Sequence, residues 1–213
     1  MNPALARYAI ALIVLASLVT SVAYFPFAPK ILVSHWNTAG EADGAMSRFW
    51  GLAIFPLLQA AIAGLLLAIP RIDPLKANIA QFRERYDLFI VIFLTYLLGL
   101  QLLVVAWNAG LRLDFNMVLP IGAGLVIFYV GTMLGHLKRN HLIGVRTPRT
   151  LASDEVWART HRISGRLFMA CGVISIAGAF FGTWALLFII APLLATVVYV
   201  VVYSYLAFRR VTR

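Results

Sequence analysis

Three side chains that bind protons or metal ions lie close together early in the chain. His35, Glu41 and Asp43 occur within one nine-residue stretch, beside the turn-forming glycines Gly40 and Gly44. An imidazole and two carboxylates can ligate a cation, or His35 and Glu41 can form an acid–base pair. Because the chain has no second such cluster, we expect a structural turn first, a contact for a ligand or peptide second, and a metal or catalytic site last.

A second polar segment, Asn140–Arg149, combines basic side chains with turn-forming residues. Gly144 permits a sharp turn, and Pro148 biases Thr147 toward an extended backbone. The bases offer a docking surface for a cytoplasmic protein or an anionic head group, or they only orient the protein in a membrane. The Arg146-Thr147-Pro148 turn favours a specific role, because orientation requires charge but not this combination.

A short helix is expected directly after this turn. Ser153 is a good N-cap, and Asp154 and Glu155 follow it in the first turn, where the helix dipole favours acids. One face carries Val156, Thr160, Ile163 and Leu167, and the other carries Glu155, Arg159, Arg162 and Arg166. This pattern predicts an interfacial helix over about 153–164, lying on a membrane surface and anchored by Trp157.

The composition shows which elements hold these segments. The chain is 62% hydrophobic and 12% charged, whereas soluble domains are about 45–50% apolar and about 25% charged. Most of its apolar segments are close to the ~20 residues that cross the bilayer as a helix. They comprise residues 8–25, 49–69, 88–107, 117–135, 167–182 and 185–208, and none contains a charged side chain. We therefore predict an all-α integral membrane protein with six transmembrane helices.

Basic residues orient these helices. Fifteen of the eighteen Lys and Arg residues fall on one side of the predicted bilayer, and the other side holds only Lys30, Arg48 and Arg112. Cytoplasmic loops carry such an excess, so we place both termini and loop 136–166 inside and loop 26–48 outside. No run of bases exceeds two residues, so nucleic acid is not an expected partner.

Each long loop follows the first helix of a predicted three-helix half, 1–115 or 116–213. The halves would have opposite orientations, as in the inverted repeats of transporters. Polar residues within the spans, including Gln59 and Gln101, are expected to cross-link helices rather than to line a path. Cys171 is the only cysteine, and the scattered histidines match no zinc-ligand spacing. We therefore expect no disulfide, metal or cofactor.

The two loops together carry a family resemblance. The stretch His35-Trp36-Asn37-x-x-Gly40-Glu41-x-Asp43-Gly44, after a proline-rich exit, resembles the N-terminal membrane module of unknown function found in the SdpI family. The stretch Asn140-x-x-x-Gly144-Val145-Arg146-Thr147-Pro148-x-Thr150-Leu151, with Trp157, His161 and Arg162 downstream, looks like that family's C-terminal signature. Arg149 stands where the family often has an aromatic residue.

The resemblance implies a non-enzymatic, multi-pass protein of a bacterial or archaeal cell membrane. Its relatives include an immunity factor that protects a producing cell from a secreted antimicrobial peptide toxin. That factor also acts as a receptor in signal transduction, capturing a small transcriptional repressor at the membrane. The implied partners are a peptide toxin outside, a small repressor inside and anionic lipids. A transporter or channel for a small solute or peptide is the alternative, and a membrane metalloenzyme using His35, Glu41 and Asp43 is less favoured.

Two groups of contact residues follow from these expectations. For a ligand or toxin outside they are His35, Trp36, Asn37, Gly40, Glu41, Asp43 and Gly44. For a partner or lipid inside they are Asn140, Gly144, Arg146, Thr147, Pro148, Arg149, Trp157, His161 and Arg162.

Overall fold

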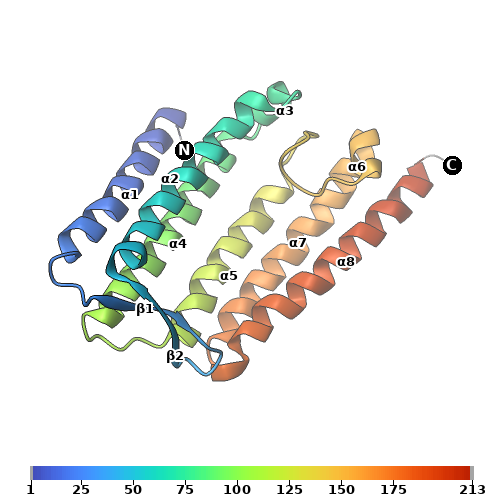
Figure 1. Cartoon of the computed structure of the whole chain (residues 1–213). Coiled ribbons are helices and arrows are strands. Elements are labelled where there is room, and N and C mark those ends of the chain that lie inside the picture. Colours follow the sequence, from blue (N-terminus) through green and yellow to red (C-terminus); the bar gives the residue numbers. More distant parts are fainter. Residues whose placement is uncertain (1, 212–213) are drawn as a thin grey trace.

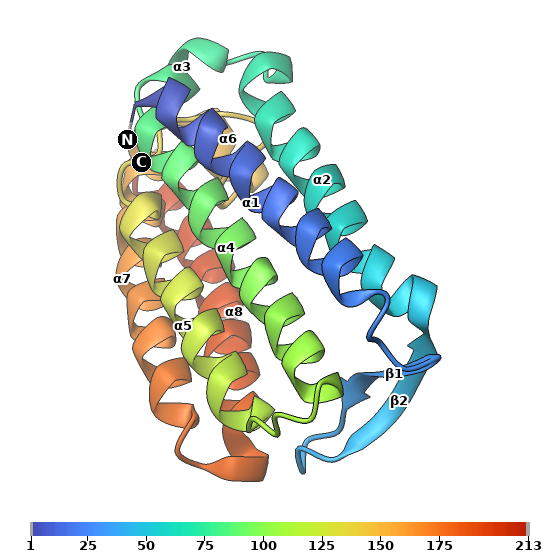
Figure 2. The same cartoon turned by 90° about the vertical axis from the view of Figure 1, so that its left-hand side faces the viewer.

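A computed structural model describes residues 2–211 of the chain. Within them six long helices lie side by side, with a β-hairpin at one end of the bundle (Figure 1). The start of α1, the end of α8 and the short helices α3 and α6 lie at the opposite end (Figures 1 and 2). The start of α1 and the end of α8 therefore share one end of the molecule, and the hairpin occupies the other.

The long helices other than α7 follow the predicted apolar segments closely. The long helices are α1 (Pro3–Tyr24), α2 (Arg48–Ile72), α4 (Arg83–Asn108), α5 (Phe115–Leu134), α7 (Asp154–Gly178) and α8 (Ala185–Val211). The short elements are β1 (Ile31–Trp36), β2 (Ala42–Ser47), α3 (Lys76–Ala80), α6 (Pro148–Ala152) and a 3₁₀ turn (Gly182–Trp184). The predicted break between the last two spans lies in this 3₁₀ turn.

Five helices within residues 2–211 are long and apolar enough to cross a membrane: α1, α2, α4, α5 and α8 with its preceding turn. The predicted helical membrane class is confirmed at this level, and the hairpin adds a small sheet to it. The α7 helix falls outside the group because its first half carries five charged side chains. Six spans therefore remain a prediction.

The α7 helix corrects the prediction for the inner loop. The expected interfacial helix and the expected fifth span form one continuous helix of 25 residues, because nothing interrupts the backbone at Gly165. Its predicted amphipathic face packs into the bundle instead of onto a membrane surface, so Val156 and Thr160 are wholly buried. Trp157 is 2% exposed and is not an interfacial anchor. The predicted N-cap is confirmed, since Ser153 Oγ accepts a hydrogen bond from Val156 N.

Helices α1, α2 and α4 pack together around a buried polar network. Gln59 Nε2 donates to Ser17 Oγ, whose hydroxyl donates to Gln101 Oε1. Gln101 Nε2 donates to the hydroxyl oxygen of Ser21, and Ser21 Oγ donates to the Leu52 carbonyl. These polar side chains bond across all three helices, as the sequence predicted, and unpaired polar groups at this depth would be costly.

Helices α5, α7 and α8 form a second group that is held by close backbone approach. Gly124 of α5 faces Gly172 of α7, and two helical turns along the same contact Gly131 of α5 faces Gly165 of α7. A methyl group on any of the four would come within 2.7 Å of a backbone atom of the other helix. Small residues at such crossings let transmembrane helices pack by van der Waals contact.

Candidate functional site

The outer loop folds into an antiparallel hairpin in which β1 pairs with β2. Asn37 forms the turn, because its Oδ1 accepts hydrogen bonds from the backbone N–H groups of Ala39 and Glu41. Gly40 completes the turn with a positive φ of 79°, a region that favours glycine. The predicted Asn37–Gly40 turn is confirmed, and it projects the neighbouring side chains from a rigid frame.

Two of the residues singled out for chemistry come together on this hairpin. His35 Nδ1 and Asp43 Oδ1 are 2.6 Å apart, and the His35 side chain is 71% exposed. The strand register is irregular on both sides of His35, and such a bulge re-aims a side chain. Gly44 lies opposite, where a methyl group would sit 2.8 Å from His35 Cβ. The close pairing therefore depends on glycine at position 44.

Glu41 takes a different partner. Its carboxylate accepts a hydrogen bond from Asn37 Nδ2 at 3.2 Å, so it supports the turn rather than forming an acid–base pair with His35. Within residues 2–211, no three His, Cys, Asp or Glu side chains are grouped so that they could hold a metal ion. What the exposed imidazole and carboxylate can do is exchange hydrogen bonds with a molecule that reaches the hairpin.

The hairpin is tied to both helix groups. The Asn108 amide at the end of α4 bonds the backbone of Val33 twice, accepting from its N–H and donating to its carbonyl. Trp36 stacks on Phe115 at the start of α5, with ring centroids 3.8 Å apart. Asn116 Nδ2 donates to the Thr38 carbonyl. A molecule that bound the hairpin would thus contact a segment attached to α4 and α5 together.

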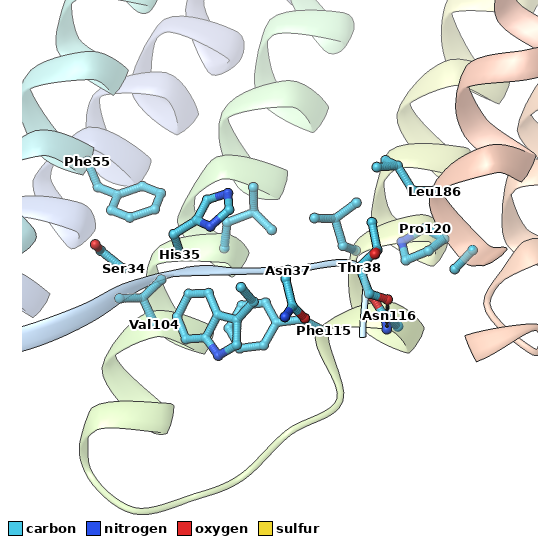
Figure 3. Close-up of a pocket in the computed structure, with 14 residues that line it drawn as sticks. Ser34, His35, Asn37, Thr38, Phe55, Val104, Phe115, Asn116, Pro120 and Leu186 are labelled. Carbon is cyan, nitrogen blue, oxygen red and sulfur yellow. Dashed lines mark hydrogen bonds between the residues drawn. The ribbon is translucent and has the colours of Figure 1, made fainter. Parts of the chain in front are cut away.

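An apolar cavity of about 300 Å³ lies under strand β1, between the two helix groups. Figure 3 shows His35 and Phe55 of α2 on the same side of the strand, with Pro120 and Leu186 across from them. Trp36 also lines the cavity, and its buried indole Nε1 has no hydrogen-bond partner within the described residues. The site thus offers a mostly apolar hollow with an exposed His–Asp pair at its rim.

The inner loop is folded by its own signature residues. Asn140 is fully buried, and its Oδ1 accepts hydrogen bonds from the backbone N–H groups of Leu142 and Ile143. Its Nδ2 donates to the Lys138 carbonyl. One side chain therefore satisfies three backbone groups of a turn that has no regular secondary structure.

His161 of α7 holds the next part of the loop. Its Nε2 accepts the N–H of Val145 at 3.0 Å, and its Nδ1 donates to the Trp157 carbonyl. The Trp157 ring stacks on the imidazole, and its Nε1 donates to the Leu137 carbonyl. Gly144 adopts a φ of 104°, and a methyl group there would clash with His161 Nε2. The close contact of His161 with the loop therefore requires glycine at position 144. We call the contacts of His161 with Gly144, Val145 and Trp157 the His161 lock.

The Arg-Thr-Pro turn begins helix α6 and fastens it to α8. Thr147 and Thr150 form a reciprocal capping box around Pro148 at the first helical position. Thr147 Oγ1 also lies 3.3 Å from Ser204 Oγ of α8. Arg149 lies over the Tyr205 ring at 4.5 Å, so the residue that departs from the family pattern stacks on α8.

Two residues that the sequence analysis did not single out tie this loop to the first helix group. Asp73 after α2 accepts the His141 N–H with Oδ2, and Asn78 of α3 donates to the Arg139 carbonyl. No local motif marks these contacts, because they join positions more than sixty residues apart. The loop therefore connects both groups at its end of the bundle, as the hairpin does at the other end.

The structure thus separates the predicted inner contact residues into two sets. Asn140, Trp157 and His161 are buried and organise the loop, with Gly144 and Thr147 supporting them. The exposed members are Arg146, Pro148 and Arg162, and Arg149 is half-buried. A partner at this end would therefore contact mainly the guanidinium groups of these arginines. The buried residues hold the loop that carries Arg146 and Arg149 in a fixed conformation.

The His161 lock predicts a pH-dependent stability. His161 lies before the apolar part of α7, and burial lowers its pKa from the ordinary 6.5 to about 4. The folded state therefore binds fewer protons than the unfolded state between those pH values. Stability is fully present above about pH 6.5 and is lost as the pH falls toward 4, by about 3 kcal/mol in total.

Thermal unfolding at pH 7 and at pH 5 measures this dependence. The His161→Gln variant keeps an acceptor but does not titrate, so its two unfolding midpoints should lie closer together than those of the wild type. The same substitution at the exposed His141 provides the control, because the His141 side chain contacts no partner within residues 2–211. His141→Gln should keep the pH dependence of the wild type. An unchanged pH dependence in His161→Gln would contradict the assignment.

Comparison with known proteins agrees with this geometry. The family model described as the SdpI/YfhL protein family matches residues 136–204, which span the inner loop, α6, α7 and most of α8. This part of the chain is therefore similar to the SdpI/YfhL family. A second model, for a domain of unknown function, matches residues 12–60, which include the hairpin.

The immunity protein SdpI of Bacillus subtilis (strain 168) is 24% identical to this chain over 197 residues, covering 91% of each protein. No solved structure matches the chain. The resemblance inferred from the two loops is therefore confirmed, since the family model and this relative both match the chain. Most of its C-terminal signature residues fold the inner loop rather than project from it.

Proposed function

We propose that this protein is a membrane immunity protein and receptor that meets a secreted antimicrobial peptide at its hairpin. The observation that carries the proposal is the exposed His35–Asp43 pair at the rim of an apolar cavity. The similarity to the SdpI immunity protein along 91% of the chain supports the same role. The excess of bases at the opposite end supports placing the hairpin outside the cell membrane of a bacterium or archaeon.

The cavity limits what the hairpin can recognise. Ligand pockets for whole small molecules measure about 300–1,000 Å³, so this cavity accommodates one or two side chains rather than a folded peptide. An apolar peptide side chain would enter it, while polar groups of the peptide bond His35 and Asp43. The exposed strand β2 offers further backbone groups to an extended peptide.

At the inner end we propose that Arg146 and Arg149 contact a small repressor protein through acidic groups. Arg146 is held by a hydrogen bond from its guanidinium to the His141 carbonyl, which presents the group in a fixed place. The halves 1–115 and 116–213 would then act as an outer sensing part and an inner responding part. Gln59, Ser17 and Gln101 of the first helix group bond one another, which supports cross-linking rather than a transport path.

Protection of a toxin-sensitive host tests the proposal. Cells expressing the wild-type chain should survive exposure to the cognate antimicrobial peptide, and cells expressing His35→Ala should lose at least about tenfold in tolerated concentration, as expected from losing one charge-assisted hydrogen bond. The matched control is His141→Ala, which removes an imidazole at the other end of the molecule. Equal survival of the two variants would count against a role for the hairpin.

Two measurements secure that comparison. Membrane abundance of each variant shows that a loss of survival is not a loss of protein. A Thr38→Cys variant in a Cys171→Ser background should react with a membrane-impermeant thiol reagent applied to intact cells, since Thr38 is exposed on the hairpin. If only lysed cells are labelled, the proposed orientation is reversed.

A further inference from the structure

A second cavity, of about 760 Å³, lies at the end of the bundle opposite the hairpin. Its walls come from the α3–α4 connection, the loop after α5 and the first turns of α7, so both helix groups contribute. Figure 2 shows α3 at this end of the bundle, opposite the hairpin. The charged and titratable side chains that line it are Arg85, His136, Lys138, Arg139, Asp154, His161 and Arg162. Its positive charge is therefore much larger than its negative charge.

The single acid is already paired. Asp154 Oδ1 lies 2.9 Å from Arg139 Nε, so it neutralises only that guanidinium. Among residues 2–211, the charged groups of Arg85, Lys138 and Arg162 have no ion-pair partner. Three cations that line one concavity repel one another, and an anion between them would relieve that repulsion.

The N-terminus of α4 adds to the same positive field. No side chain caps this 26-residue helix, and Phe82 at the N-cap position lines the cavity. The positive end of the helix dipole favours an anion there. The His136 ring donates from Nδ1 to the Thr132 carbonyl, which fixes its orientation at the wall.

The cavity lies at the level where the apolar parts of the helices begin. Arg85 precedes the apolar run of α4 by three residues, and Arg162 precedes that of α7 by five. Gly135, directly after α5, lines the same space. Phe82 and Trp157 provide buried aromatic walls. Such a position corresponds to the head-group region of a bilayer rather than to bulk water.

We propose that this cavity binds the phosphate and glycerol of an anionic phospholipid from the leaflet at that end. Arginine forks match phosphate oxygens in a bidentate manner, and lysine adds a point charge. A free phosphate ion would leave most of 760 Å³ empty, whereas a glycerophosphate head group fills more of it. Basic pockets between transmembrane helices bind lipid head groups in this way. The bound lipid would bridge α4 and α7, and thus the two helix groups.

Lipid binding to the purified full-length chain tests the proposal. In neutral detergent, native mass spectrometry should show that phosphatidylglycerol binds at least about tenfold more tightly than phosphatidylcholine, since each base near an anionic lipid contributes about fivefold. The triple variant Arg85→Gln, Lys138→Gln, Arg162→Gln should lose at least about tenfold in phosphatidylglycerol affinity. If that variant does not fold, Arg162→Gln alone should lose about fivefold.

The matched control removes three bases at the same end that do not line the cavity: Arg71→Gln, Lys76→Gln and Arg166→Gln. Its affinity for phosphatidylglycerol should change less than about threefold, because general attraction by net charge is weak at moderate salt. Equal losses in the two triple variants would overturn the proposal, as would a wild type without preference for phosphatidylglycerol. Inorganic phosphate that raised the unfolding midpoint as much as the lipid would assign the site to a soluble phosphate instead. None of these outcomes depends on immunity to a peptide.

Discussion

The Gly131→Ala variant is expected to unfold at a much lower temperature than the wild type. The added methyl group would lie 2.5 Å from Met169 N and 2.7 Å from the Gly165 carbonyl oxygen. Both are backbone atoms, so the clash cannot be relieved by a side-chain rotation and must push α5 away from α7. Overpacking usually costs about 1–3 kcal/mol, and we expect the upper end here. Thermal unfolding followed by fluorescence-detected size-exclusion chromatography measures the effect.

The control for this variant is the same chemical change at a glycine with free space. Gly99 lies within α4, and no atom comes within 4 Å of a methyl group built on it. Gly99→Ala should leave stability unchanged or raise it, because alanine favours a helix by up to about 1 kcal/mol over glycine. If Gly131→Ala were as stable as Gly99→Ala, the two helices would be able to separate at little cost.

The glycine contacts hold the second helix group by close backbone approach, whereas a buried polar network joins the helices of the first. Lipid tails are as apolar as leucine, so no hydrophobic force draws transmembrane helices together. Dispersion attraction grows with close approach, and the glycine pairs place the α5 and α7 backbones in contact. The seven-residue spacing of Gly124 and Gly131, and of Gly165 and Gly172, is visible in the sequence. Its meaning depends on which helices are neighbours, and the sequence alone does not state that.

The helix positions could be predicted from the sequence because apolar runs report them directly. The predicted span 49–69 lies within α2 (Arg48–Ile72), and 185–208 lies within α8. The prediction failed where a second explanation existed for the same pattern. The alternating faces of 154–164 fit either a membrane surface or a groove in a protein, and the bundle provides the groove. A membrane-surface helix and a packed helix share one periodicity.

The candidate sites show the same division between local and long-range information. The Asn37 turn involves near neighbours in sequence, so spacing and residue type were sufficient to predict it. The expected pair of His35 with Glu41 was wrong, because the irregular strand register brings Asp43 to His35 instead. The docking of the hairpin was not predictable, since Asn108 reaches Val33 across 75 positions. The inner signature was recognised as specific, but the structure gives several of its residues an internal role that the pattern did not reveal.

The hairpin and the inner loop each contact both helix groups. The hairpin contacts α4 and α5 at one end, and the inner loop contacts both α8 and the α2–α3 segment at the other. Each loop therefore crosses the boundary between the helix groups. A peptide that changed the position of the hairpin would bias how the groups meet, and the rigid inner loop would move with them. In this proposal, movement of the hairpin reaches the opposite end of the molecule only if the inner loop moves as a rigid unit.

The Asn140→Ala variant tests whether the inner loop is such a body. It removes three hydrogen bonds and leaves the N–H groups of Leu142 and Ile143 and the Lys138 carbonyl without their partner. Each unsatisfied buried group costs about 1–3 kcal/mol, so we expect a loss of at least about 3 kcal/mol in the local stability of residues 138–147. Amide hydrogen exchange should accelerate there by about 100-fold, while exchange in the membrane helices changes little.

The control is Asn116→Ala, which removes one hydrogen bond to the Thr38 carbonyl at the hairpin end. It should leave exchange in residues 138–147 unchanged. With the loop opened, the proposed repressor contact at Arg146 should weaken in Asn140→Ala although no contact residue is altered. Exchange in 138–147 that matched the wild type would mean that the loop is held mainly by the His161 lock and by its attachment to α8. The buried amide would then be a local packing detail rather than the centre of the fold at this end.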